Sequence, residues 1–377
     1  MNRKIASHYA LISGELRKNI VVEVSEDRTI VSVREVRNLD SEAHVEFYPG
    51  ILIPGMVNAH CHLELSYLAG AIPEGTGFSG FAGAIGAVRN NFSNEERIAA
   101  ASRADSRMWH EGVEAVVDIT NDELVMPVKS ASKIEYHTLF ELFGFRHTTA
   151  NDHFAMAQRH PNSSVTPHSI YSVSDEPFKQ ICNNGDMPLS IHFLESPDEK
   201  LLYEHKGSLA EWYGRMGWEC DFLHYETPSR RIVESIPSTR RLLLVHGCMV
   251  LASDIRLLND HFDIAPTWVV CPESNRYISN LKPPYDTLLT MNVPMAIGTD
   301  SAASARSLSM IDNMRLIENV PLARLLEWAT LGGAKAIGID NRIGSIEVGK
   351  KPGLVVIEGA DLHEQKLTAE SRARRII

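Results

Sequence analysis

Two histidines one residue apart end an extended apolar stretch near the start of the chain. The apolar run over residues 50–53 is interrupted by Pro54-Gly55 and continues to His60, Cys61 and His62. In a β-strand, side chains two residues apart point to the same side, so His60 and His62 can bind one metal ion while Cys61 points away. A His-x-His pair also occurs on ordinary polar strands, so its meaning depends on the residues that follow it.

Further imidazoles and one carboxylate stand at the ends of later apolar segments. His168, His192 and His246 each close such a segment, and Asp300 follows the apolar run at 295–298. One histidine at a strand end is commonly structural, but several from separate strands, together with an aspartate, are not explained by core packing. Three imidazoles and a carboxylate form a donor set that suits Zn²⁺ or Fe²⁺ and leaves a position for water.

The segments that carry these residues alternate between strand and helix. Besides the segment that ends at His62, apolar strand-like runs occupy residues 113–118, 134–141, 164–168, 189–192, 242–246, 265–271 and 295–300. Eight such strands separated by helices predict an α/β fold, a parallel (β/α)8 TIM barrel, whose catalytic groups stand at the carboxyl ends of the strands. An open doubly wound sheet is less favoured because no Gly-x-Gly-x-x-Gly motif follows the first strand.

Both chain ends are rich in β-forming runs. Residues 1–53 contain such runs at 9–12, 20–24 and 29–33, and the stretch from Ile343 to Ile357 is strand-like again. Because termini often lie close together, we expect residues 1–53 and 341–377 to form a small β-sandwich domain beside a barrel domain over residues 54–340. A simple terminal hairpin is the alternative for the C-terminal stretch.

Two further segments of the barrel have a local signature. The glycine-rich stretch 70–86 predicts a long loop, in which Phe78 and Phe81 can cover an aromatic ring or lie at the surface. The next segment predicts a helix that runs to Trp109, since Ser93 precedes Glu96 by three residues as in a capping box.

Composition limits the classes of partner. The 377 residues include 44% hydrophobic and 23% charged residues, as in a globular protein, and the formal charge of −11 argues against a nucleic-acid site. No stretch has the length or hydropathy of a membrane span, and the five scattered cysteines form no Cys-x-x-Cys pair, which fits reduced thiols. We therefore expect a cytoplasmic protein that acts on a small molecule, with homo-oligomer formation left open.

Several short motifs follow one another in a familiar order. They are Pro-Gly-Met-Val-Asn-Ala-His-Cys-His at 54–62, His-Phe-Leu-Glu at 192–195, Val-His-Gly at 245–247, Cys-Pro-Glu-Ser-Asn at 271–275, Gly-Thr-Asp-Ser at 298–301 and Ile-Gly-Ser-Ile-Glu-Val-Gly-Lys at 343–350. Over nearly the whole chain, this pattern resembles the amidohydrolase superfamily, in particular its mononuclear deaminase and chlorohydrolase branch.

The resemblance implies a role for most of the polar residues at the strand ends. It makes four residues metal ligands: His60, His62, His192 and Asp300. It makes His246 either a further ligand or the group that orients the attacking water, and we favour the second role. Glu195 is similar to the proton shuttle of the deaminases, although a carboxylate that starts a loop can also be a solvated side chain.

Three other residues are candidates for contact with substrate. His168 stands where related deaminases place a substrate-contacting histidine, and Glu141 and Glu64 are further candidates. Each of the two glutamates has a structural hydrogen-bond role as its alternative. The strand at 134–141 and the one at 165–168 contain no lysine of the kind that bridges two metals in binuclear members, so we expect one divalent ion, with Zn²⁺ favoured over Fe²⁺ or Mn²⁺.

The chemistry expected of such a site is hydrolytic deamination of an aminated heterocycle, a purine or nucleoside-like compound. A divalent ion lowers the pKa of bound water so that hydroxide exists near neutral pH, with Asp300 as a proton acceptor. Glu195 would protonate a ring nitrogen. Hydrolytic dechlorination and cleavage of a cyclic amide by the same site stay open, and a scaffold that has lost its metal is the non-enzymatic alternative.

Overall fold

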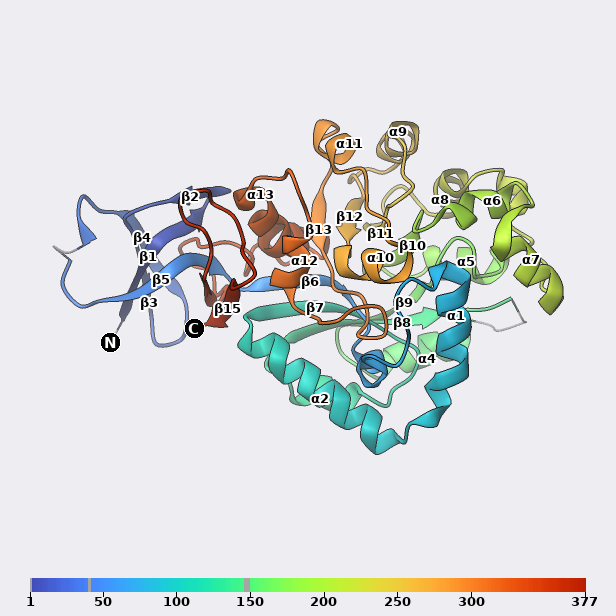
Figure 1. Ribbon diagram of the computed structural model, residues 1–377, viewed down its shortest axis with the longest axis horizontal. Coiled ribbons are helices and arrows are strands. Elements are labelled where there is room, and N and C mark those ends of the chain that lie inside the picture. The colour runs from blue at the N-terminus through green and yellow to red at the C-terminus, as the bar shows by residue number, and fades with distance from the viewer. Residues whose placement is uncertain (1, 40–41, 146–149) are drawn as a thin grey trace.

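The computed structural model describes residues 2–39, 42–145 and 150–377, which form two units that lie side by side (Figure 1). A sheet built from both chain ends forms one unit, and parallel strands surrounded by helices form the other. The labels for the N- and C-termini both lie in the sheet unit, at one end of the molecule.

The smaller unit is a seven-stranded sheet with the order β15-β14-β5-β1-β3-β4, in which β2 pairs with β1. Its strands are β1 (Arg3–Ile12), β2 (Glu15–Arg17), β3 (Ile20–Val24), β4 (Ile30–Glu35), β5 (Val45–Pro54), β14 (Leu354–Glu358) and β15 (Arg372–Arg375). Because β5 pairs with β1 in parallel and with β14 in antiparallel register, the two chain ends share one sheet. A small sheet domain built from both termini is thus confirmed, and its limits at residues 53 and 341 stay a prediction.

The chain between Ile343 and Leu354 differs from the strand that its sequence predicted. Residues 343–353 form turns, and the strand β14 begins only at Leu354. Gly344, Gly349 and Gly353 have φ angles of 87°, 91° and 66°, a left-handed backbone that interrupts an extended strand. The prediction of a strand from Ile343 was wrong for these residues because alternation of apolar side chains was given more weight than the glycines between them.

The larger unit contains eight parallel strands in two four-stranded sheets. The first sheet holds β6 (Met56–Cys61), β7 (Val113–Thr120), β8 (Glu135–Leu142) and β9 (Ser163–Pro167), and the second holds β10 (Leu189–Phe193), β11 (Leu242–His246), β12 (Thr267–Val270) and β13 (Met295–Ile297). Isolated parallel bridges connect the sheets at both edges, Cys61 to Asp300 and Ser169 to His192. This is the (β/α)8 TIM-barrel fold that the alternating segments predicted.

One of these edges brings two candidate ligands together. The Asp300 amide donates to the His60 carbonyl at 3.0 Å, and Asn58 Nδ2 donates to Thr299 Oγ1 at 2.7 Å. A Cβ on Gly298 would lie 2.8 Å from the His60 Cβ, so only glycine allows the chain to approach this closely. The contact between β6 and the segment after β13 therefore fixes His60 beside Asp300.

Helices surround the barrel strands. They are α1 (Gly77–Val88), α2 (Asn94–His110), α3 (Met126–Ala131), α4 (Asn151–Gln158), α5 (Asp175–Cys182), α6 (Pro197–Tyr203), α7 (Gly207–Met216), α8 (Pro228–Ser235), α9 (Ala252–His261), α10 (Pro272–Ser279), α11 (Tyr285–Thr290), α12 (Met310–Arg315), α13 (Leu322–Glu327) and α14 (Gly333–Ala336). Helix α2 has the predicted capping box of Ser93 and Glu96. None of the helices in the described ranges is long and apolar enough to cross a membrane.

The stretch 70–86 is only partly the loop that its glycines predicted. Helix α1 begins at Gly77, and the side chains of Phe81 and Ile85 pack against a buried cluster that includes Leu68. Packing of these apolar side chains outweighs the low helix propensity of the glycines between them. The prediction of a loop was wrong from Gly77 onward.

The barrel interior is apolar below the strand ends. One buried cluster combines residues of both four-stranded sheets, among them Ala115 and Leu139 of the first and Val245 and Val269 of the second. Side chains that meet in this way fill a barrel as a packed core. Polar groups are thereby confined to the ends of the strands, where the candidate residues stand.

The start of β8 is tied to the C-terminal part of the chain by a partly exposed ion cluster, which gives a first testable prediction. Glu135 receives hydrogen bonds from Arg342 at 2.7 and 3.1 Å and lies 3.0 Å from His137 Nε2. The hydrogen bond with His137 and those with Arg342, opposed by partial burial, lower the pKa of Glu135 to about 2. Because the pKa is lowered on folding, this carboxylate stabilises the protein above the unfolded pKa and loses that effect as pH falls toward 2.

We expect Glu135→Gln to lower the free energy of unfolding at pH 7 by ~1 kcal/mol, after allowance for partial exposure of the group. The difference from the unmodified protein should shrink between pH 4.5 and pH 2, as measured by urea unfolding at a series of pH values. Glu358→Gln, which removes an exposed pair with Arg374, is the matched control and should change stability little. A difference that stays constant over this pH range would contradict the assignment.

Candidate metal and catalytic site

His60 and His62 stand at the end of β6 with their rings turned toward each other. Their Nε2 atoms lie 3.2 Å apart, and His60 is fully buried. The Ser190 hydroxyl lies 3.2 Å from His60 Nδ1 and holds that ring by its other nitrogen. Burial, followed by the neighbouring His62, lowers the pKa of His60, so its imidazole stays neutral, which is the form that binds metals.

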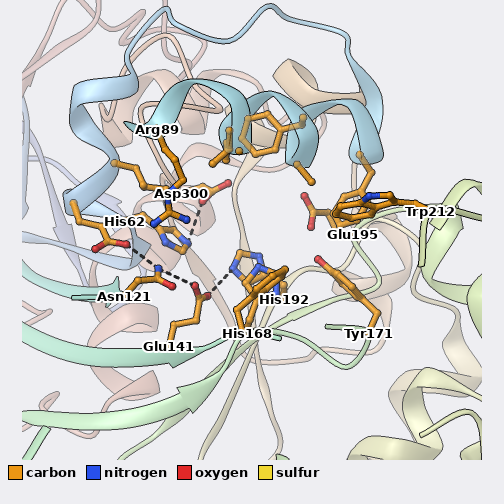
Figure 2. A pocket seen from close by; sticks show the side chains of 18 of the residues that line it. His62, Arg89, Asn121, Glu141, His168, Tyr171, His192, Glu195, Trp212 and Asp300 are labelled. Carbon is orange, nitrogen blue, oxygen red and sulfur yellow. Dashed lines mark hydrogen bonds and ion pairs between the residues drawn. The ribbon is translucent and has the colours of Figure 1, made fainter. Parts of the chain in front are cut away.

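Asp300 faces these two rings from the segment after β13. Its Oδ1 lies 3.5 Å from His62 Nε2 and 3.9 Å from His60 Nε2 (Figure 2). Its other oxygen, Oδ2, accepts hydrogen bonds from the hydroxyls of Ser274 at 2.5 Å and Ser304 at 2.9 Å. Burial alone would raise its pKa, but the surrounding imidazoles hold the pKa below the ordinary value, so Asp300 is a carboxylate with one oxygen directed at the histidines.

His192 and His246 close β10 and β11 and are hydrogen-bonded to each other. His246 Nδ1 lies 2.7 Å from the Asn275 side-chain oxygen, so this nitrogen donates. His246 Nε2 must then accept, and it lies 2.9 Å from His192 Nδ1, which donates to it. The tautomer of His246 therefore determines that of His192. Because His192 carries its proton on Nδ1, its Nε2 has a free lone pair.

That lone pair gives a test of whether the residues fit a metal ion. Within the described residues, His192 Nε2 is buried and has no hydrogen-bond partner. Ligand atoms of His60, His62 and His192 all lie within 4.8 Å of one another. A buried nitrogen without a partner is costly unless a ligand satisfies it, and three imidazoles beside a carboxylate match the donors of Zn²⁺, Fe²⁺ or Mn²⁺. The donor set therefore fits a divalent ion.

Two of these strand-end residues have strained backbones. His246 and Asp300 have φ angles of 77° and 58°, in the left-handed region that non-glycine residues rarely adopt. Such strain is kept only where the surrounding structure determines it, and it gathers at functional sites. Asp300 is fixed by the bridge to Cys61, and His246 by Asn275.

Glu195 lies on the loop after β10 and lines the same cavity as Asp300 (Figure 2). Its side chain is buried, and its Oε1 is 3.8 Å from His246 Nε2. Burial raises its pKa, with the nearby imidazoles of His246 and His62 opposing that effect. A carboxyl group whose pKa is raised retains its proton closer to neutral pH, as a proton donor requires.

The candidate substrate residues form the floor between β6, β8 and β9. Asn121 Nδ2 donates to Glu64 Oε1 at 2.8 Å and to Glu141 Oε2 at 3.3 Å, so it connects the two carboxylates. Burial raises the pKa of Glu141 to about 7, and its Oε1 lies 3.9 Å from His192 Nε2. His168 stacks on His192 with ring centroids 4.5 Å apart, and burial lowers its pKa to about 3.

These side chains open into one cavity of about 350 Å³. His62, Glu64, Glu141, His168, His192, Glu195 and Asp300 all line it, whereas His60 and His246 lie behind the lining. Helix α1 covers one side with Phe78 and Phe81, and helix α7 with the following turn supplies Trp212 and Trp218. Of the two alternatives that the sequence left open for Phe78 and Phe81, the cavity wall is the one observed, although a helix and not a loop carries them.

Several residues of the site had not been assigned a role from the sequence. Ser274 and Asn275 lie in the motif at 271–275, and Ser304 lies three residues after the motif at 298–301. Neither motif specifies that these residues hold Asp300 and His246. Asn121 directly follows β7, so its place at a strand end was the signal that could have identified it. Trp212 and Trp218 belong to α7 and the turn after it and carry no local signal.

Comparison with known proteins agrees with this geometry. Residues 51–377 match the amidohydrolase family model. An adenosine deaminase of Helicobacter pylori is 25% identical over 356 residues, which cover 88% of this chain and 85% of that protein.

Two solved structures share the fold across nearly the whole chain. The aminofutalosine deaminase of Helicobacter pylori in complex with methylthio-coformycin has a TM-score of 0.81 at 23% identity, with both chains fully covered. A zinc-bound adenosine deaminase of Xanthomonas campestris has a TM-score of 0.76 at 25% identity, covering 97% of this chain and 86% of that one. The chain belongs to the amidohydrolase family and is a metal-dependent hydrolase that acts on carbon–nitrogen bonds.

Proposed function

We propose that the protein deaminates an aminated heterocycle, a purine or nucleoside-like compound, by hydrolysis. The observation that carries the proposal is the position of Glu195, a buried carboxyl group with a raised pKa on the wall of the same cavity as His62, His192 and Asp300. A site that only activated water would not need a proton donor beside these histidines. The names of the relatives, adenosine deaminase among them, support the same chemistry.

We assign one divalent ion to His60, His62, His192 and Asp300, with Zn²⁺ favoured over Fe²⁺ or Mn²⁺. An ion held by these donors supplies Lewis acidity that makes water nucleophilic near neutral pH. Zinc in the Xanthomonas campestris relative supports this choice. The neutral imidazoles of His60 and His192, whose pKa values are lowered mainly by burial, suit this role.

The reaction forms a C–O bond to water and breaks the C–N bond to the amino group. The amino group leaves as ammonia when it takes the proton that Asp300 accepted from the water, and Glu195 recovers its proton from the new hydroxyl group as the carbonyl forms. Asp300 accepts a proton from the attacking water through Oδ1, because Ser274 and Ser304 occupy Oδ2. Glu195 donates a proton to the ring nitrogen beside the reacting carbon, which prevents negative charge from building up on the heterocycle. His246 holds His192 by accepting from its Nδ1, and its Nε2 lies 3.8 Å from Glu195 Oε1. Orientation of the attacking water by His246, the role favoured from the sequence, would require Nε2 to exchange His192 for the water.

The cavity suits a heterocycle with a substituent. Its volume of about 350 Å³ lies in the range of small-molecule sites, ~300–1,000 Å³. His168, which is uncharged at neutral pH because burial lowers its pKa, and the connected carboxylates of Glu64 and Glu141 offer hydrogen bonds to the ligand. The rings of Phe78 and Trp212 offer stacking surfaces.

Ammonia release from a panel of aminated compounds tests the proposal. The zinc-loaded protein is incubated with purine nucleosides, including 5′-thio-substituted ones, and with aminated pterins, pyrimidines and triazines. We expect ammonia from the purine nucleosides. Chloride release from a chlorotriazine without any ammonia would replace deamination by dechlorination, and a protein that retains no metal would be a non-enzymatic scaffold.

A cation on the cavity wall predicts a preference within this class. Among the described residues that line the cavity, Arg89 is the only lysine or arginine, and its side chain is exposed. We expect substrates with an anionic substituent to bind better than their neutral analogues. Arg89→Met should raise KM ~10–100-fold for anionic substrates and leave neutral ones nearly unchanged, since a hydrogen bond to a charged group contributes ~1.5–3 kcal/mol. Arg103→Met on the exposed side of α2 is the control.

A further inference from the structure

The loop that carries Glu195 is held by a second buried glutamate. Glu199 lies in the first turn of α6 and is fully buried. Its carboxylate accepts three backbone hydrogen bonds from successive residues: Leu194 at 2.7 Å to Oε2, and Glu195 at 2.5 Å and Ser196 at 3.3 Å to Oε1. Both carboxylate oxygens are therefore directed at the backbone of the loop, away from the cavity.

Capping of the helix explains only one of these three bonds. In a capping box, the third helical residue accepts from the amide of the N-cap residue, which is Ser196 here. Two other helices of this chain show that ordinary form: Glu96 accepts from Ser93 at 2.8 Å, and Asp254 accepts from Leu251 at 2.9 Å. Glu199 alone of the three also accepts from the two amides before the N-cap, those of Leu194 and Glu195. These two amides lie on either side of the Leu194 α-carbon.

The two additional bonds support a backbone that is strained. Leu194 has a φ angle of 51°, in the left-handed region that a leucine avoids unless its surroundings enforce it. On the other side of the same residue, the Leu194 carbonyl accepts from the Met249 amide at 2.8 Å, in the loop that follows His246. Leu194 is thus fixed from both sides, and the next side chain, Glu195, is turned into the cavity.

Retention of a carboxylate at this place is unfavourable in other respects. Burial raises the pKa of Glu199 well above its ordinary value, and the nearby charge of Glu195 raises it further. A helix cap at the surface would avoid both effects, as Glu96 does. Glu199 is thus a buried carboxyl group that is unfavourable in free energy and does not contact the substrate. Its role therefore lies in the loop conformation that its hydrogen bonds enforce.

We propose that Glu199 is a positioning residue that aims Glu195 at the reacting heterocycle. The inference rests on the proposed function, in which Glu195 is the proton donor. Glu199 makes no contact with the substrate in this account, and its whole effect on turnover passes through the orientation of Glu195. Loss of its carboxylate should let Leu194 relax toward an extended conformation and move the proton donor away from the ring nitrogen.

A double-mutant cycle between the two glutamates tests this. Glu199→Gln keeps the volume of the side chain but replaces one accepting oxygen with an NH₂ group that cannot accept from the loop. We expect kcat to fall ~10–100-fold with KM and metal content within twofold, because only proton donation is impaired. In a Glu195→Gln background, the same substitution should lower kcat less than twofold, since the group through which it acts is already gone.

A merely structural role for Glu199 would give a different pattern. Its substitution would then lower kcat by the same factor in both backgrounds, or would release the metal, and either result overturns the proposal. Asp254→Asn makes the equivalent change in the cap of α9 and should leave kcat unchanged. If Glu199→Gln does not fold, the cycle is repeated with Glu199→Asp, whose shorter carboxylate cannot reach all three amides. If Glu195→Gln itself leaves kcat unchanged, the proposed function fails instead, independently of the coupling.

Discussion

Replacement of His192 with alanine is expected to abolish both metal retention and turnover. His192 is the donor whose free lone pair is prepared by two successive hydrogen bonds, from His192 to His246 and from His246 to Asn275. Its removal leaves a cavity where a ligand stood and leaves His246 without its donor. Because loss of a hydrogen-bond partner of a ligand already costs ~10–100-fold in metal affinity, loss of the ligand itself should cost at least ~100-fold.

Metal content by elemental analysis and the thermal shift on addition of Zn²⁺ measure this without relying on activity. The unmodified protein should bind about one ion per chain and gain thermal stability with Zn²⁺, since an ion that binds only the folded state stabilises it. His192→Ala should show neither effect, and His60→Ala should behave in the same way. His363→Ala, which changes an exposed histidine of the sheet domain, is the control. A variant with full metal and full turnover would exclude its residue as a ligand.

The positions of the candidate ligands could be predicted because each depends on local rules. The two-residue period of a strand predicts that His60 and His62 share a side, and their Nε2 atoms indeed lie 3.2 Å apart. The rule that catalytic groups occupy the carboxyl ends of barrel strands predicts that His192 and Asp300 lie near this pair. His192 does so although it is more than 130 residues from His60 along the chain. Each ligand can therefore be predicted from its position at the end of a single strand, without knowledge of the other strands.

The groups that orient these residues could not be predicted in the same way. Asn275 holds His246 and Ser274 holds Asp300 through side-chain contacts between different βα units. The distances that make these contacts depend on the register of the barrel and on loop conformations, and neither has a local signature. Glu199 shows the limit well, because its spacing from Ser196 predicts only a helix cap, whereas its two further bonds require the left-handed turn at Leu194.

The glycine-rich stretch 70–86 was misjudged for a related reason. Local propensity counts each glycine against a helix, but Phe81 and Ile85 of α1 are four residues apart and pack on the same cluster as Leu68. Tertiary packing therefore selects the helix, and the same helix places Phe78 on the cavity wall. A loop would have made this wall adaptable, whereas a helix presents its rings in a fixed arrangement.

Glu195→Gln is expected to leave about one metal ion per chain while kcat falls at least ~10²-fold, because a positioned proton donor contributes ~10²–10⁴ in rate. The glutamine has nearly the size of the glutamate and can still accept from a neighbour, but it cannot transfer a proton to the ring nitrogen. Its residual turnover should also lose the decline with rising pH that deprotonation of Glu195, whose pKa is raised by burial, imposes.

The comparison with His192→Ala separates proton donation from metal binding. Glu195 is not in the group that His60, His62 and His192 form, although its carboxylate lies within 4.8 Å of ligand atoms of His192 and His246. Its substitution should therefore spare the metal that His192→Ala releases. Metal analysis and ammonia release are measured on both variants with the same substrate. If Glu195→Gln releases ammonia at a near-normal rate, hydrolysis proceeds without this proton donor and deamination loses its main support. If it loses metal as fully as His192→Ala, Glu195 belongs to the metal site, and proton donation and metal binding are not the separate tasks assigned to these residues.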